Sequence, residues 1–360
     1  MSPLRIALVG AGYWGPNLAR NFSSSPDWDL AAVCDLDPVR AGALAAQVGS
    51  VAVTSSFQDL VADPAVDAVA IATPARTHFP LAMAALRAGK HVLVEKPLAD
   101  SAGNGAQMVA AARERDLVLM ADHTYCYTPA VMKIRELVQD GSLGEILFVD
   151  SVRINLGLIQ PDVNVFWDLA PHDLSILDYV LPGGLTPERV AAQGADPLGA
   201  GRSCVGHLTL PVGANGAMAH ISVNWLSPTK IRQMVIGGTR RTLVWDDLNP
   251  QQRLSIYDRG VDLQNQLLGS ANADPAASRI SYRLGDTWAP ALPEREALGA
   301  VVGEFAAAIR DGRAALTSGA SGLRVLSVLE AADQSLKQMG APAPVREAGL
   351  AQDLGMETVG

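Results

Sequence analysis

A glycine-rich turn near the start of the chain constrains the fold more than any other feature of the sequence. The apolar segment Leu4–Val9 runs directly into Gly10, Gly12 and Gly15, a GxGxxG pattern that opens a helical segment. In this setting the first glycine permits a tight turn, the second lets the backbone approach a pyrophosphate, and the third lets the helix pack on the strand. The N–H groups at the helix start then face the phosphates. The pattern predicts a dinucleotide-binding unit; a glycine-rich turn without a ligand is the alternative.

An acid at the end of the next strand strengthens this prediction and bears on the cofactor. Asp35 follows the strand-like segment Leu30–Cys34, 20 residues after Gly15. A carboxylate at this place hydrogen-bonds the ribose 2′-hydroxyl and repels a 2′-phosphate. Neither Leu36 nor Asp37 supplies an arginine for such a phosphate. The sequence therefore favours NAD over NADP.

The hydrophobic pattern changes along the chain. Segments before residue 125, such as His91–Val94, are almost continuously apolar, which is typical of parallel strands covered on both faces. Later segments, such as Ile146–Asn155, alternate between apolar and polar residues, which predicts a mixed or antiparallel sheet with one open face. The expected fold class is α/β, with a Rossmann domain over residues 1–125 and an α+β domain for substrate binding and oligomerisation over residues 126–360.

Helices and loops are expected at several places in the second part. Helical patterns cover Glu294–Ile309 and Gly322–Gln338, and a helix is expected from about His172 to Val180. Pro197–Gly201 and Ser270–Ser278 are rich in proline, glycine or alanine, which favours surface loops.

Composition narrows the class of partner. The formal net charge is −9 and the pI is near 5.1, whereas nucleic-acid binding needs a basic face. No apolar run reaches the roughly 18 residues of a membrane helix, and the first residues run into a strand rather than a cleavable signal. Three scattered cysteines favour a reducing cytoplasm. Without an HExxH motif or a Cys/His cluster, no metal site is predicted.

A lysine stands at the carboxyl end of one predicted parallel strand. Glu95, Lys96 and Pro97 follow the apolar run that starts at His91. A cation at this edge points toward the ligand crevice and can stabilise an alkoxide that forms as hydride leaves. A surface lysine paired with Glu95 is an equally good interpretation of this motif alone.

An aspartate and a histidine four residues apart form a third candidate. Asp168 and His172 flank Pro171, which suggests a helix start and would bring the two side chains close across a turn. A histidine oriented by a carboxylate is a good general base near neutral pH. Taken alone, helix capping by Asp168 and a buried structural histidine explain the pattern better. Of the other histidines, His78 and His123 follow strands and are candidates to line the cofactor cleft.

Taken in order, these motifs resemble a known family. The segments GAGYWG, ATPARTH, GKHVLVEKPLA and DxxxH, together with the ending GRAALTSGASGLRVLSVLEAADQSL, are similar to the glucose-fructose oxidoreductase, inositol dehydrogenase and MocA family over nearly the whole chain. The resemblance implies that the helices near residues 294–338 pack back on the first domain. It also implies a homodimer or homotetramer formed through the open sheet face.

The resemblance also assigns roles to residues. Lys96, Asp168 and His172 take the places of the catalytic residues. The cofactor contacts fall on Gly10, Gly12, Tyr13, Trp14, Gly15, Asp35, Thr73, Pro74, His78, Glu95 and Lys96, with His123 as a further candidate. Many members carry an arginine where this chain has Cys126.

The substrate is less well defined than the cofactor. The segments RINLG and DVNVFWDLAPHD resemble the branch that oxidises the 3-hydroxyl of UDP-N-acetylglucosamine. The candidate substrate contacts, besides Lys96 and His172, are Arg153, Asn155 and Asn164, with Lys230 and Arg232 as phosphate or carboxylate contacts. Lys230 and Arg232 fit a solvated strand edge equally well.

The function that follows is reversible hydride transfer between NAD and a secondary alcohol of a sugar, sugar nucleotide or cyclitol. His172 would act as base, oriented by Asp168, while Lys96 stabilises the oxyanion. A keto-sugar reductase and a glycosidase that uses NAD transiently are enzyme alternatives. A non-catalytic NAD-sensing regulator is a further alternative, against which the presence of Lys96, Asp168 and His172 argues.

Overall fold

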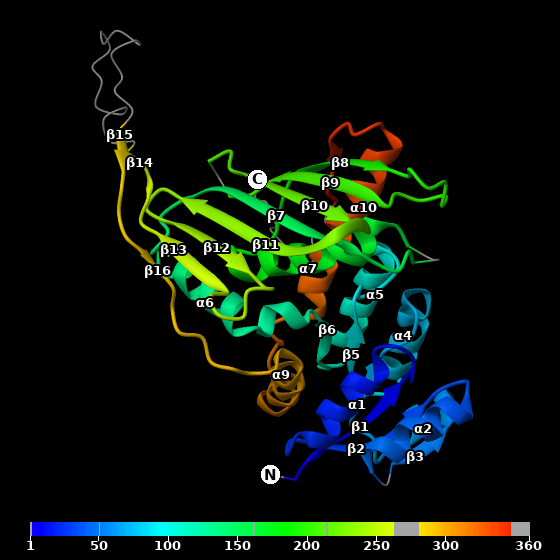
Figure 1. Cartoon of the computed structure of the whole chain (residues 1–360). Coiled ribbons are helices and arrows are strands. Elements are labelled where there is room, and N and C mark those ends of the chain that lie inside the picture. The colour runs from blue at the N-terminus through cyan, green and yellow to red at the C-terminus, as the bar shows by residue number, and fades with distance from the viewer. Residues whose placement is uncertain (1, 50, 161–162, 214, 263–280, 347–360) are drawn as a thin grey trace, which may run out of the picture.

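The first sheet holds six parallel strands in the order β3-β2-β1-β4-β5-β6 (Figure 1). The strands are β1 (Leu4–Val9), β2 (Trp28–Cys34), β3 (Ala52–Thr54), β4 (Ala68–Ile71), β5 (His91–Glu95) and β6 (Leu119–Asp122). Chain order reverses between β1 and β4, and ligands bind beside the carboxyl ends of such strands. The computed structural model describes residues 2–49, 51–160, 163–213, 215–262 and 281–346.

Helices cover both faces of this sheet. They include α1 (Gly15–Ser24), α2 (Pro38–Val48), α3 (Phe57–Ala62), α4 (His78–Arg87) and α5 (Ala102–Arg113). Alternate residues of each strand enter different cores, because successive side chains of a strand point to opposite faces. In β1, Ile6 and Leu8 pack on one face, and Ala7 and Val9 pack on the other. The predicted parallel sheet with two covered faces is confirmed.

The second sheet holds nine strands in the order β16-β13-β12-β11-β7-β10-β9-β8-β17. They are β7 (Ile146–Leu156), β8 (Arg189–Ala195), β9 (Val205–Pro211), β10 (Met218–Asn224), β11 (Leu226–Gly238), β12 (Thr242–Asp246), β13 (Leu254–Tyr257), β16 (Thr287–Trp288) and β17 (Ala343–Pro344). Strands β7 and β10 are parallel, and the other pairs are antiparallel. The sheet is therefore mixed, as predicted. Strands β14 (Gly260–Asp262) and β15 (Ser281–Arg283) form a separate hairpin.

One face of the second sheet packs against helices, and the other stays open (Figure 1). The helices of this half are α6 (Pro129–Gln139), α7 (Val165–Val180), α9 (Ala297–Asp311) and α10 (Gly319–Lys337). In β10, Ala219 and Ile221 are buried toward them, whereas His220 on the opposite face is exposed. None of the helices in the described ranges is long and apolar enough to cross a membrane.

The last two helices connect the two sheets. Helix α9 packs against α1, and Trp28 stacks there on Phe305 with 5.3 Å between ring centroids. Trp28 Nε1 also donates to the Val302 carbonyl at 2.8 Å. Helix α10 lies against α5, α7 and β8, so close to α5 that a Cβ on Gly105 would lie 2.7 Å from Leu326. This packing fixes one sheet relative to the other.

Two predicted loops have different outcomes. Pro197–Gly201 lies between β8 and β9, and Gly199 and Gly201 adopt positive φ angles there. Ser270–Ser278 lies outside the described residues.

Candidate functional site

The glycine turn lies at the carboxyl end of β1 and has one position without steric contacts. A Cβ on Gly10, which has φ +101°, would lie 2.6 Å from the Ala72 carbonyl oxygen. A Cβ on Gly15 would lie 2.2 Å from the Gly10 oxygen, so both glycines are required by the fold itself. A Cβ on Gly12 would meet nothing within 4 Å. Gly12 therefore leaves room above the start of α1, which fits a pyrophosphate at this turn.

Asp35 is held against this turn. Its Oδ2 accepts from the Ala11 N–H at 2.7 Å, and its Oδ1 accepts from the Asp37 N–H at 2.9 Å. Arg40 on α2, which the sequence interpretation did not consider, lies 3.8 Å from Asp35 and 3.4 Å from Asp37. Two carboxylates thus balance the one nearby guanidinium. This arrangement suits a ribose 2′-hydroxyl better than a 2′-phosphate.

His78 lies behind the cleft rather than in it. It is buried, with Nδ1 at 2.8 Å from the Pro97 carbonyl and Nε2 at 2.7 Å from the Thr73 carbonyl. Burial lowers the pKa of His78. A neutral imidazole can donate to only one of these two carbonyls, and its burial between them joins the two loops. Its contact with the cofactor stays a prediction. Thr73 and Pro74 remain beside the glycine turn, with Thr73 Cγ2 at 3.0 Å from the position of a Gly10 Cβ.

Two carboxyl groups meet at the ends of β5 and β6. Glu95 and Asp122 are neighbours in the strand register. Asp122 accepts from Thr124 Oγ1 at 2.6 Å and from Trp14 Nε1 at 3.4 Å, whereas Glu95 Oε1 is buried and has no partner within the described ranges. Burial, and then the neighbouring Asp122 carboxylate, raise the pKa of Glu95 well above its usual range. A protonated Glu95 can both donate and accept a hydrogen bond.

His123 continues from β6 into the same region. Its side chain is buried, and neither ring nitrogen has a partner among the residues that the structure describes. Burial lowers the pKa of His123 to about 4, with a smaller effect of Lys96 in the same direction. The imidazole is therefore neutral near pH 7. Its contact with the nicotinamide stays a prediction.

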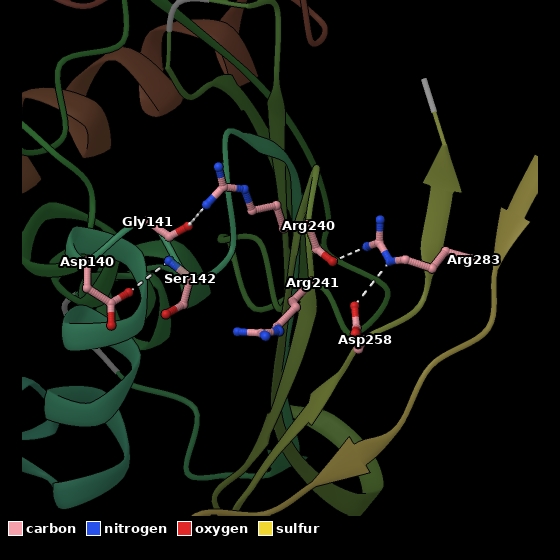
Figure 2. A pocket seen from close by; sticks show the side chains of 7 residues that line it. All are labelled: Asp140, Gly141, Ser142, Arg240, Arg241, Asp258 and Arg283. Atoms are coloured by element: carbon pink, nitrogen blue, oxygen red, sulfur yellow. Dashed lines mark hydrogen bonds and ion pairs between the residues drawn. The ribbon is translucent and has the colours of Figure 1, made fainter. Parts of the chain in front are cut away.

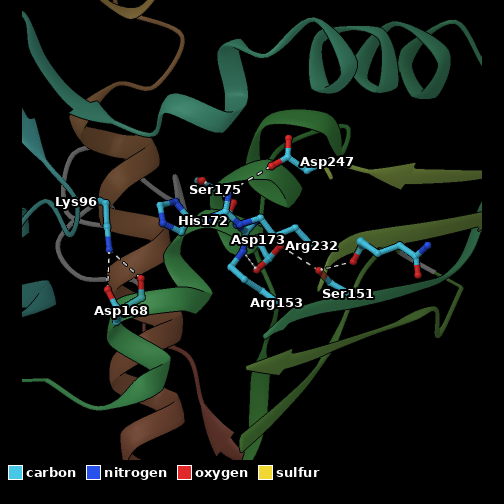
Figure 3. Close-up of polar contacts among 10 residues, drawn as sticks. Lys96, Ser151, Arg153, Asp168, His172, Asp173, Ser175, Arg232 and Asp247 are labelled. Atoms are coloured by element: carbon cyan, nitrogen blue, oxygen red, sulfur yellow. Dashed lines mark hydrogen bonds and ion pairs between the residues drawn. The ribbon is translucent and has the colours of Figure 1, made fainter. Parts of the chain in front are cut away.

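Lys96 forms an ion pair with Asp168 across the two halves of the chain (Figure 3). Its Nζ donates to the Asp168 carbonyl at 2.9 Å and to Oδ1 at 3.0 Å. The side chains remain 22% and 19% exposed, so both keep access to a ligand. Pro171 lies inside the helix and lacks the N–H that would bind the Trp167 carbonyl, one residue before the carbonyl that Lys96 binds.

Helix α7 begins at Val165, earlier than the sequence predicts. Asn164 is its N-cap, with Oδ1 accepting from the N–H groups of Phe166 and Trp167 at 3.0 and 3.2 Å. Its Nδ2 donates to Asp333 at 2.9 Å. Asn164 therefore caps α7, and its contact with a substrate stays a prediction.

His172 lies one turn after Asp168 on α7, but the two side chains are not hydrogen-bonded. Asp168 Oδ1 binds Lys96, and Oδ2 accepts from Trp225 Nε1 at 2.9 Å. The expectation that Asp168 orients His172 is therefore not met. His172 Nδ1 is buried without a partner in the described ranges, and the ring meets Tyr125 edge-on at 5.0 Å. Burial, and then the charges of Lys96 and Arg153, lower the pKa of His172 well below its usual value.

A second, fully buried ion pair lies beneath these residues. Arg153 on β7 donates from Nε and Nη2 to the two oxygens of Asp173 at 2.7 and 3.1 Å. Ser151 Oγ donates to the same carboxylate at 3.0 Å, and Tyr125 lies under the guanidinium at 4.5 Å. Both side chains of the pair are only 2% exposed. Arg153 thus binds α7 to the sheet, and its contact with a substrate stays a prediction.

The remaining predicted substrate contacts lie along β7 and β11. Asn155 is half-buried near the end of β7. Arg232 lies 5.7 Å from the Tyr125 ring and 3.4 Å from Asp247, and its side chain is 30% exposed. Lys230 is exposed two residues earlier on β11. Arg232 is therefore near His172 through Tyr125, whereas no hydrogen bond or ion pair joins Lys230 to the other candidates in the described part of the chain.

Models of two family domains match the chain. One, described as an oxidoreductase family with an NAD-binding Rossmann fold, matches residues 4–123, and the other, the GFO/IDH/MocA C-terminal domain, matches residues 131–244. The UDP-N-acetylglucosamine 3-dehydrogenase of Acidithiobacillus ferrooxidans is 30% identical over 331 residues, which cover 91% of this chain and 95% of that enzyme. This chain belongs to the GFO/IDH/MocA oxidoreductase family. It is an NAD-binding oxidoreductase, as predicted.

Other GFO/IDH/MocA members and related structures agree over nearly the full length. Inositol 2-dehydrogenase of Rhizobium meliloti is 26% identical and covers 93% of this chain and 97% of its own. The solved structure of the Acidithiobacillus ferrooxidans enzyme has a TM-score of 0.79 at 27% identity and covers 94% and 99% of the two chains. GenD2 from gentamicin A biosynthesis, solved in complex with NAD, has a TM-score of 0.79 at 26% identity and covers 96% and 97%.

A surface cleft of about 430 Å³ lies elsewhere on this GFO/IDH/MocA chain, at the end of α6 and the turn between β11 and β12 (Figure 2). Its lining residues are Asp140, Gly141, Ser142, Arg240, Arg241, Asp258 and Arg283. Arg283 donates from Nε to Asp258 at 3.1 Å, and none of the predicted site residues lines this cleft.

Three residues of the site were missed by sequence reasoning. Asp122 ends a parallel strand beside the strand that precedes Lys96, so the rule used for Lys96 could have found it. Tyr125 follows His123 by two residues but belongs to no motif that predicts its role. Trp225 binds Asp168, which lies 57 residues away in the sequence, and no local sequence pattern predicts such a contact.

Proposed function

We propose that this protein oxidises a secondary alcohol of a sugar nucleotide with NAD, and that the 3-hydroxyl of a UDP-N-acetylglucosamine-like sugar is the first candidate. The observation that carries the proposal is the meeting of Lys96, Asp168 and His172 beside the carboxyl end of β5. The Acidithiobacillus ferrooxidans relative, which is named for this substrate and covers 91% of the chain, supports the substrate class.

The cofactor site is assigned to the carboxyl edge of the first sheet. Gly12 leaves space for the pyrophosphate, and Asp35 offers a carboxylate to the ribose. The other residues that would hold NAD are Gly10, Tyr13, Trp14, Gly15, Thr73, Pro74, Glu95, Lys96 and His123. When bound, NAD supplies the acceptor for the hydride.

Lys96 is assigned to the reacting oxygen. A lysine ammonium has three N–H donors, and the Asp168 carbonyl and carboxylate take two of them. The third donor then binds the alcohol oxygen of the substrate. As the C–H bond breaks, negative charge grows on this oxygen, and a cation already fixed in place stabilises it without reorganisation.

His172 is assigned to the proton of the alcohol. Its lowered pKa keeps the imidazole neutral near pH 7, so that a ring nitrogen can accept a proton. Lys96 and Arg153 disfavour the imidazolium that results, which eases release of this proton after the reaction. Asp168 acts on Lys96 in this scheme, and His172 is oriented instead by packing against Tyr125.

A phosphate anchor is assigned to Arg232. Its guanidinium lies 5.7 Å from the ring of Tyr125, which also packs on His172, and its partner Asp247 at 3.4 Å is a weak competitor for a phosphate. Lys230 and Asn155 would extend this subsite along β11 and β7.

Self-association through the open face of the second sheet is also proposed. This face carries the exposed apolar side chains Phe148, Leu156 and Ile231, with 37%, 74% and 36% exposure. Such a group on a sheet face is typical of a surface that a partner covers. Sedimentation of the protein at several concentrations should show a dimer or tetramer, and a monomer at every concentration would contradict this assignment.

The test of the function is nicotinamide absorbance at pH 7 to 9 with NAD or NADP. The panel holds UDP- and TDP-sugars, free aminosugars and inositols, and Arg232→Met is assayed beside the wild type. We expect NADH formation with a UDP-sugar, and a raised KM for that substrate in R232M. Turnover of free sugars or inositols alone would refute the nucleotide assignment. Tight NADH binding without turnover of any compound would favour a keto-sugar reductase or an NAD-sensing regulator.

A further inference from the structure

Trp225 connects the second sheet to the catalytic ion pair. It stands between β10 and β11 and is 1% exposed. Its Nε1 donates to Asp168 Oδ2 at 2.9 Å, while Asp168 Oδ1 accepts from Lys96 Nζ at 3.0 Å. The carboxylate is therefore held between a lysine from the first sheet and an indole from the second.

The indole cannot easily move away from this position. The Trp225 N–H donates to the Cys204 carbonyl at 3.0 Å, and the Trp225 carbonyl accepts from Gly157 at 2.9 Å. A Cβ on Gly157 would lie 3.2 Å from the indole ring, so the loop after β7 also packs against it. A rigid donor in a buried position fixes the rotation of the carboxylate that it binds.

This rotation determines where Lys96 can point. With Oδ2 bound to the indole, Oδ1 faces Lys96, and two of the three ammonium protons are directed to Asp168. Without the indole N–H, the carboxylate can turn and offer both oxygens to the ammonium. A third N–H would then be drawn from the substrate oxygen toward Asp168.

We propose that Trp225 is a positioning residue, whose indole N–H holds Asp168 so that one donor of Lys96 stays available to the reacting oxygen. This proposal rests on the role of Lys96 in the proposed function. The proposal adds a residue of the second sheet to a site whose other residues lie at the end of β5 and on α7.

The test compares two buried tryptophans of the same sheet. Trp225→Phe removes the indole N–H and keeps an apolar ring. Trp245→Phe is the matched control, because Trp245 is 0% exposed and its Nε1 has no partner in the described residues. Trp245 meets the Tyr125 ring at 6.0 Å, and phenylalanine keeps an aromatic ring at this contact. Hydrogen bonds to charged groups are strong enough that we expect kcat of W225F to fall by about tenfold or more. The dissociation constant of NADH and the KM for NAD should stay unchanged, and W245F should keep its kcat within about twofold.

A second measurement does not depend on turnover. The indole N–H resonances of the six tryptophans are recorded by NMR with ¹⁵N-labelled tryptophan, and single Trp→Phe changes at the other five assign the signal of Trp225 by elimination. In Asp168→Asn and in Lys96→Met, the Trp225 signal should shift while that of Trp245 stays in place. Because Trp225 is intact in both variants, this arm decides the contact even if W225F does not fold.

The outcomes separate the two proposals. Equal kcat values for W225F and W245F, or an unmoved Trp225 resonance in D168N, would overturn the role of Trp225. The role would also be overturned if the loss of kcat in W225F came with weaker NADH binding and lower thermal stability. Absence of turnover by the wild-type protein with every sugar would count against the proposed function alone, and the NMR result would still decide the contact between Trp225 and Asp168.

Discussion

Helix α7 carries two ion pairs that differ in almost every respect. Asp168 binds Lys96 at 3.0 Å, and the two side chains are 19% and 22% exposed. Asp173, five residues later, binds Arg153 through both of its oxygens, and both side chains are 2% exposed. The first pair joins the end of β5 to α7 through a flexible ammonium, and the second fixes the helix to β7 through a planar guanidinium.

The difference shows that α7 carries a structural ion pair and a ligand-accessible ion pair at separate positions. In the buried pair, Asp173 accepts from Arg153 and Ser151, so its carboxylate is fully used in holding α7. In the outer pair, Lys96 has a third donor that no described residue takes. The buried pair thus holds the helix still while the outer pair remains open to a ligand, and His172 lies between them (Figure 3).

The strongest test of this contrast is Lys96→Met. Loss of the cation at the reacting oxygen should lower kcat by at least about 10³-fold, because a fixed charge there stabilises the transition state directly. A partly exposed pair adds about 1 kcal/mol or less to stability, so the unfolding free energy and NADH binding should hardly change. Steady-state kinetics and denaturant unfolding measure both, with Lys133→Met on the surface of α6 as control. Full activity in K96M would refute the catalytic assignment.

The complementary change is Arg153→Met, which should act on stability first. It leaves the Asp173 charge buried without its partner, and such a loss costs about 3 to 5 kcal/mol of unfolding free energy. Arg20→Met is a suitable control, because the Arg20–Glu296 pair is about half exposed and should contribute about 1 kcal/mol or less. Chemical denaturation compares the two variants. If R153M were as stable as R20M, the buried pair would not be the support described above.

The sequence identifies both residues of the outer pair as candidates, although not their contact, and it does not identify Asp173. The motif around Lys96, the spacing of Asp168 and His172 and the glycine turn all follow from local order, because strand ends and helix turns place side chains predictably. The fold class follows from the periodicity of the apolar residues for the same reason. The partner of each charge does not, since Arg153 and Trp225 reach α7 through the packing of a distant sheet.

The structural roles of two predicted substrate contacts were hidden from the sequence for the same reason. Arg153 and Asn164 carry polar groups near the site and therefore fit a substrate contact by composition. The structure uses them for a buried pair and a helix cap, which are decided by tertiary packing. The helix start was misplaced because Pro171 favours a first turn, whereas the Asn164 cap starts the helix earlier and leaves the proline inside.

Buried His123 and exposed His220 extend the comparison between buried and exposed groups to two histidines. Burial lowers the pKa of His123 to about 4 in the folded protein, from 6.5 for an ordinary histidine. The unfolded chain then binds the proton more readily, so stability from this group is complete above about pH 6.5 and is lost as pH falls toward 4. Between pH 7 and pH 5 we expect a loss of about 2 kcal/mol from His123. His123→Phe should flatten the dependence of unfolding free energy on pH, and exposed His220→Gln should not. An equally steep dependence in H123F would contradict this account.

A change at Asp35 has the smallest expected effect of these variants. It tests whether burial alone identifies a side chain with a structural role. The Asp35 side chain is only 10% exposed, as in a structural pair, yet it binds two backbone N–H groups next to the cofactor turn rather than a buried cation. If burial alone identified a structural role, Asp35→Ser would lower the stability of the fold and leave the preference between NAD and NADP unchanged. We expect instead that D35S weakens the binding of NAD by about tenfold, because the contact with the ribose is lost. We also expect tighter binding of NADP, because Arg40 is freed from one of its two carboxylates. Fluorescence titration with NADH and NADPH decides between these outcomes, and Asp37→Ser, which removes only the second carboxylate, shows how much of the change comes from Arg40.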